Sequence, residues 1–274
     1  MPGFRPHVDV LLVLGSVVAI YLIWSRRHER ATGEATSAHN RRLFLSGMGV
    51  LLIGSTWPLH DLAEHTWYAA HMVQHMAYTL VAAPLLVSGI PAWMWRSALR
   101  TDGSRRVWRE LTRPVVALVV SNAVLLFTHW PAIVNTTVRT EPLHFGLHVL
   151  LVASAVIMWW PVFSPLPELP PISPPGQMLY LFAQSLVPMI PASFLTFGHT
   201  PLYQVYTTFP RLFGISAMTD QLIAGLLMKI LGSLILWGYI TVIFFRWAAR
   251  ERNEGWDAMA LRDVEADVRT GLTR

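Results

Sequence analysis

The chain has 274 residues, of which 53% are hydrophobic and only 14% are charged. Soluble domains carry about 25% charged residues, so this composition excludes an ordinary soluble protein and favours a membrane protein. The formal net charge is +5, but there is a single lysine and the arginines stand at the ends of apolar runs, which argues against nucleic acid as a partner. Because cysteine is absent, any bound metal would need imidazole, carboxylate, thioether or water as ligands.

Long apolar stretches recur along the chain. A bilayer core requires about 20 mostly apolar residues per helix. On this basis the sequence predicts an all-α, polytopic transmembrane bundle of about seven helices within residues 1–247. The expected spans are, in chain order, Val8–Trp24, Leu43–Trp57, His71–Trp93, Pro114–Trp130, Pro142–Val162, Gln177–Phe197 and Met218–Trp247. The second is short, and we expect it to continue past Pro58 as a kinked or interfacial segment.

The arginines predict an orientation for this bundle. They gather between the first two spans, between the third and fourth, and after the seventh. The positive-inside rule therefore places the N-terminus outside and the C-terminus inside the cell. Residues 248–274 would form a cytoplasmic tail, and their mixture of charged and apolar residues is compatible with a helix on the inner lipid surface.

Most of the eleven histidines fall at the predicted outer ends of the spans. His71 and His75 are four residues apart, as are His144 and His148, so each pair shares one helix face about 5–6 Å apart. This spacing allows two imidazoles to chelate one ion.

Acidic and thioether side chains accompany the histidines. Buried ionisable groups within a membrane usually face the bundle interior or a wet cavity. We therefore predict a metal site drawn from nine residues: His60, Asp61, His65, His71, Met72, His75, His144, His148 and Asp220. The alternative interpretation is structural: a histidine at a membrane interface is ordinary, Asp220 after Thr219 can cap a helix, and Met72 can simply pack.

Lys229 lies near the middle of the last predicted span. An intramembrane lysine is a candidate functional residue, paired with a carboxylate or a lipid headgroup. The alternative is that its long side chain reaches the membrane surface.

Several short motifs together resemble a known family. They are His71–His75 (HMVQH), Ala82–Leu86 (AAPLL), Gly89–Pro91 (GIP), Trp159–Val162 (WWPV), Pro201–Tyr203 (PLY), Asp220-Gln221 and Ala224-Gly225. From about Trp57 to Trp247 the chain resembles the multispanning CtaG family of cytochrome c oxidase assembly proteins. The resemblance implies a factor that helps a haem–copper oxidase mature in a bacterial cytoplasmic membrane. Copper delivery to an oxidase subunit is the implied chemistry, and the HMVQH pair and Asp220-Gln221 carry over best.

These observations lead to one main hypothesis and three alternatives. The main hypothesis is an assembly factor that receives copper from an extracytoplasmic chaperone and passes it to an oxidase subunit, with His71 and His75 as primary ligands. The alternatives are a membrane haem protein, a metal transporter or proton-conducting channel, and a scaffold whose histidines only pack. The sequence shows no nucleophile–base pair or phosphate loop in support of catalysis.

Overall fold

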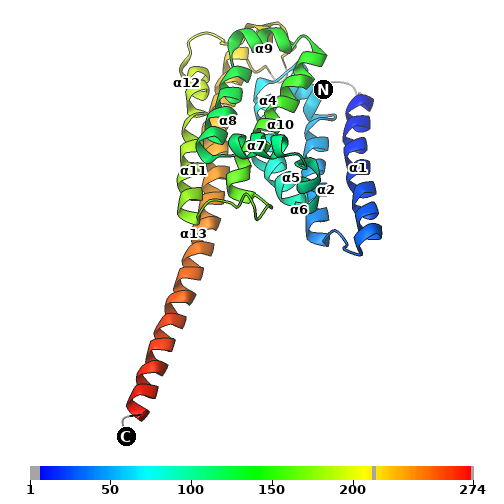
Figure 1. Cartoon of the computed structure of the whole chain (residues 1–274). Helices are drawn as coiled ribbons and strands as arrows, with labels where there is room; N and C mark the ends of the chain where they lie inside the picture. The colour runs from blue at the N-terminus through cyan, green and yellow to red at the C-terminus, as the bar shows by residue number, and fades with distance from the viewer. Residues whose placement is uncertain (1–6, 212–213, 273–274) are drawn as a thin grey trace.

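The computed structural model describes residues 7–211 and 214–272, with side chains as far as Asn253. The fold is all-helical: helices make up 80% of it, and the described residues contain no strand (Figure 1). This confirms the predicted fold class.

The helices follow one another with short connections. In chain order they are α1 (Val8–Thr32), α2 (Ala38–Gly54), α3 (Leu59–His65), α4 (Tyr68–Met76), the π-helix η1 (Ala77–Ala82), α5 (Ala83–Gly89), α6 (Ala92–Ala98), α7 (Asp102–Leu111), α8 (Pro114–Thr128), α9 (Pro131–Thr137), α10 (Glu141–Phe163), α11 (Pro174–Leu186), α12 (Met189–Phe197), the 3₁₀-helix η2 (Gln204–Thr208) and α13 (Ala217–Leu272).

Among the described residues, five helical segments are long and apolar enough to cross a membrane: Val8–Thr32, Tyr68–Gly89, Glu141–Phe163, Pro174–Phe197 and Ala217–Asn253. Two bent pairs, α2 with α3 (47°) and α7 with α8 (76°), raise the number to seven if each pair is one span. The bend between α2 and α3 includes Pro58, where the sequence predicted that the second span would kink. The bundle thus has five to seven candidate spans.

Helix α13 continues without interruption to Leu272, and its last part extends away from the bundle (Figure 1). Residues 248–272 are therefore helical and continuous with the last span. Their position on the inner lipid surface stays a prediction, as does the predicted orientation of the bundle.

The span formed by α4, η1 and α5 packs against α2, α10 and α13. Its middle is a π-helix, in which backbone hydrogen bonds connect residues five apart, an arrangement often found at functional sites. Two side chains from neighbouring helices bind carbonyls of this segment. The Trp159 indole donates to the Thr79 carbonyl (2.7 Å), and the Tyr239 hydroxyl donates to the Leu80 carbonyl (3.2 Å). The π-helix is thus held from α10 and from α13.

The other end of this span packs closely on α2. A Cβ atom at Gly89 would lie 2.3 Å from the Phe44 backbone nitrogen, so only glycine allows this approach. Tyr21 of α1 donates a hydrogen bond to the Gly89 carbonyl (3.1 Å) and stacks on Phe44 with ring centroids 3.8 Å apart. This contact fixes α1, α2 and α5 relative to one another.

Candidate metal site

Three histidines from two helices meet between α4 and α10. His71 and His75 lie one turn apart on α4, with ring centroids separated by 4.1 Å, and His148 faces them from α10. The Nε2 atoms of His75 and His148 are 3.1 Å apart. One nitrogen from each of the three rings lies within 4.8 Å of the others. We call His71, His75 and His148 the histidine trio.

The trio contains ring nitrogens that the protein leaves unpaired. The Nδ1 atoms of His71 and of His75 are buried and have no hydrogen-bond partner among the described residues. Such an atom costs about 1–3 kcal/mol when nothing binds it, so native proteins rarely tolerate several together. A neutral imidazole nitrogen is a common metal ligand, and a bound ion would supply the missing partner.

Asp220 holds the helix that carries His71 and His75. Its carboxylate accepts hydrogen bonds from the backbone N–H groups of Tyr68 and Ala69, both at 2.9 Å, and Arg211 lies 3.4 Å from the same carboxylate. Asp220 is only 2% exposed. The structure therefore places this predicted ligand at the start of α4, where it caps the helix, and not among the trio. Helix capping was the alternative role predicted for Asp220 from the sequence. Asp220 does cap a helix, but that helix is α4 and not α13, to which Asp220 itself belongs.

Gln221, the neighbour of Asp220 in the family motif, has a similar bracing role. Its Oε1 atom accepts hydrogen bonds from the backbone nitrogens of Leu202 (2.8 Å) and Tyr203 (3.2 Å), and its Nε2 atom donates to the Tyr203 carbonyl (3.1 Å). The Asp220-Gln221 motif thus connects α13 both to α4 and to the segment that follows α12.

A polar cavity of about 330 Å³ lies beside the trio. We call it the polar cavity; its lining includes His7, His60, Glu64, His65, Glu141, His144 and His148. The Glu64 Oε1 atom lies 3.2 Å from His60 Nε2 and 3.1 Å from His144 Nε2. Four predicted ligands therefore line this cavity: His60, His65, His144 and His148. Of these four, only His148 also belongs to the trio.

Asp61 is fully buried next to this cavity, where its carboxylate lies 3.0 Å from His7 Nε2. His7 and Glu64 were not among the predicted ligands. Glu64 could have been predicted as a neighbour of His60, because it follows His60 by four residues and the two side chains then share one face of α3. No local pattern connects His7 to Asp61, which is 54 residues away.

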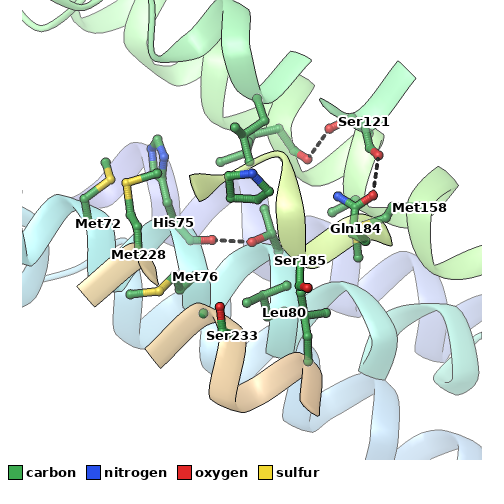
Figure 2. A pocket seen from close by; sticks show the side chains of 18 of the residues that line it. Met72, His75, Met76, Leu80, Ser121, Met158, Gln184, Ser185, Met228 and Ser233 are labelled. Carbon is green, nitrogen blue, oxygen red and sulfur yellow. Dashed lines mark hydrogen bonds between the residues drawn. The ribbon is translucent and has the colours of Figure 1, made fainter. Parts of the chain in front are cut away.

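A second cavity, of about 80 Å³, lies on the other side of His75 between α4, α8, α10, α11 and α13. Methionine side chains are its most distinctive lining, with four of them contributed by α4, α10 and α13: Met72, Met76, Met158 and Met228. Figure 2 shows the sulfur atoms of Met72 and Met228 near the His75 ring and that of Met76 farther from the ring on the same side of the view. We call this space the methionine cavity. The structure places Met72, a predicted ligand, in its wall.

Lys229 makes a contact different from the one expected. Its Nζ atom lies 4.3 Å from the centroid of the Phe197 ring, at the end of α12. A cation above an aromatic face is attracted by the ring quadrupole, so Phe197 is a partner in place of a carboxylate. The lysine side chain therefore reaches toward the end of the bundle that carries the histidines.

The family assignment agrees with this architecture. The sequence model of the cytochrome c oxidase caa3 assembly factor family (Caa3_CtaG) matches residues 19–250, which include the trio, the lining of the methionine cavity and Asp220. No curated protein and no solved structure was found to match the chain. This chain belongs to the family of cytochrome c oxidase caa3 assembly factors.

Proposed function

We propose that this assembly factor binds copper at the histidine trio and passes it to a subunit of its client cytochrome c oxidase, in a bacterial cytoplasmic membrane. Family membership supports the role in oxidase assembly. The observation that carries the copper step is the convergence of three imidazoles, two of which are buried with unpaired Nδ1 atoms. In this proposal copper is cargo, and the protein catalyses no reaction of its own.

The donor set favours copper over other first-row metals. Imidazole is a ligand for copper, zinc, iron and nickel, so three imidazoles restrict the ion to this group. Thioethers select copper further, and the methionine cavity adjoins His75. The polar cavity, with Glu64 and Glu141 in its wall, provides a polar and acidic approach to His148 for a cation delivered by an extracytoplasmic chaperone.

The geometry favours an ion over haem. A haem held by two axial histidines requires a gap between their rings that the porphyrin can enter. The facing Nε2 atoms of His75 and His148 are at hydrogen-bonding distance, so no such gap separates them.

The test is the copper content of the purified full-length protein. We expect the double variant His71→Ala/His148→Ala to bind one copper ion per chain fewer than the wild type after identical loading. The matched control is His39→Ala/His199→Ala, which removes two exposed histidines outside the trio and should bind as much copper as the wild type. Equal copper in the trio variant and the wild type would refute the site.

A cellular measurement separates copper handling from scaffolding. A strain that expresses the trio variant at wild-type level should assemble an oxidase deficient in copper. Normal oxidase activity in that strain would assign the chain a scaffolding role and contradict the proposal.

A further inference from the structure

The methionine cavity lies deeper among the spans than the trio and has a different chemical character. Its walls are mainly apolar, with serine hydroxyls and the Gln184 amide as the principal neutral polar groups. Among the described residues that line it, none carries a carboxylate or a guanidinium group. The volume of about 80 Å³ exceeds the ~15 Å³ that one water molecule requires. The cavity therefore has room for a small ion.

One nitrogen donor in this cavity is already in the form that binds a metal. His129 Nδ1 lies 2.8 Å from the Leu125 carbonyl, and a carbonyl can only accept a hydrogen bond, so Nδ1 carries the proton. In the neutral ring Nε2 then presents a lone pair. This Nε2 atom is buried without a hydrogen-bond partner, and His129 is only 7% exposed. A backbone carbonyl that fixes the ring and its tautomer is the usual outer support of a metal-binding histidine.

The sulfur donors of the cavity are equally buried. Met72, Met76 and Met228 are between 2% and 8% exposed, and they come from α4 and α13, the two helices that Asp220 connects. A single buried methionine is most often a packing residue. Three thioethers that border one cavity together with an unpaired imidazole nitrogen form a soft donor set.

The electrostatics of the cavity select the oxidation state. The cost of moving an ion from water into a medium of low dielectric constant grows with the square of its charge, so Cu²⁺ costs about four times as much as Cu⁺. No carboxylate among the described lining residues offsets that cost. Neutral thioether and imidazole ligands in an apolar cavity therefore suit Cu(I).

We propose that the methionine cavity is a second copper site, which binds Cu(I) through the thioethers of Met72, Met76 and Met228 and the imidazole of His129. This inference rests on the proposed function and extends it. His148 borders the polar cavity and belongs to the trio, and His75 belongs to the trio and borders the methionine cavity. The polar cavity, the trio and the methionine cavity are thus connected in that order through His148 and His75. A Cu(I) ion bound at the trio can move from imidazole to thioether ligands without a change of oxidation state.

The experiment is anaerobic titration of the full-length protein in lipid nanodiscs with Cu(I), in competition with a chromophoric Cu(I) chelator. We expect two ions per chain for the wild type and one for Met72→Leu/Met76→Leu/Met228→Leu. Leucine for methionine nearly conserves volume, so the fold should persist. The matched control, Met48→Leu/Met94→Leu, changes two buried methionines outside the cavity and should keep both ions.

The variant His71→Ala/His148→Ala separates the two sites. It should retain one Cu(I), and X-ray absorption should show sulfur in the coordination shell of that ion. Two bound ions in the triple methionine variant, or a wild-type spectrum with nitrogen ligands alone, would overturn the second site and leave the trio intact. A wild-type protein that binds no copper would overturn both proposals.

Discussion

Removing the Asp220 carboxylate should loosen the start of α4 and weaken copper binding without abolishing it. In Asp220→Ala, the buried N–H groups of Tyr68 and Ala69 each lose an acceptor at 2.9 Å. A buried donor left unsatisfied costs about 1–3 kcal/mol, so the pair should cost about 2–6 kcal/mol of unfolding free energy. Arg211 also loses its carboxylate neighbour, which adds to the loss.

The consequence for copper follows from the position of the cap. His71 lies within the first turn of α4 after Tyr68 and Ala69, so an uncapped α4 must be reordered before the trio can form. If half of the lost free energy, about 1–3 kcal/mol, opposes copper binding, the Kd for copper rises about 5-fold to 150-fold, because 1.4 kcal/mol corresponds to a factor of ten. The number of ions per chain should not change.

Two measurements on the same samples check this reasoning: denaturant unfolding in detergent and competitive copper titration. Asp102→Ala is the matched control, because Asp102 is fully exposed in the first turn of α7, and it should alter neither result. An Asp220→Ala variant with unchanged stability and one copper ion fewer per chain would mean that Asp220 is a ligand and that the capping argument is wrong.

Two further substitutions test how the central span is held. Tyr239→Phe should cost about 1 kcal/mol in unfolding free energy, because it removes the hydroxyl that donates to the Leu80 carbonyl of the π-helix; an unchanged denaturation midpoint would show that this hydrogen bond is not needed. Gly89→Ala should lower the unfolding free energy by about 1–3 kcal/mol or more, since its Cβ would overlap the Phe44 backbone. Gly49→Ala is the control: a Cβ there meets nothing within 4 Å, so this variant should be neutral or stabilising in the same assay. Equal stability of the two alanine variants would contradict the close α2–α5 contact.

The spans and the core of the trio could be predicted from the sequence because they rest on local patterns. Apolar length identifies membrane spans, and a four-residue spacing places His71 with His75 and His144 with His148 on shared helix faces. The choice between His144 and His148 could not be made locally. It depends on how α10 is rotated against α4, which brings His148 to His75 and directs His144 toward Glu64.

Contacts between distant segments account for what the sequence could not predict. Asp220 caps a helix 152 residues earlier in the chain, and no periodicity indicates such a pairing. The methionine cavity draws donors from α4, α8 and α13, so its members look like ordinary core residues when each helix is read alone. The signal that could have pointed to it is the combination of many methionines with no cysteine in a membrane protein.

The segment that carries His71 and His75 is held at both ends by the same neighbouring helix. Asp220 of α13 caps the start of α4, and Tyr239 of α13 binds the π-helix that follows His75. A metal site retains its affinity only when its ligands are held close to the binding geometry, and here α13 provides that support at two points about 19 residues apart along its length. Trp159 of α10, the helix that carries His148, also binds the π-helix, so the three rings of the trio stand on elements that are hydrogen-bonded to one another.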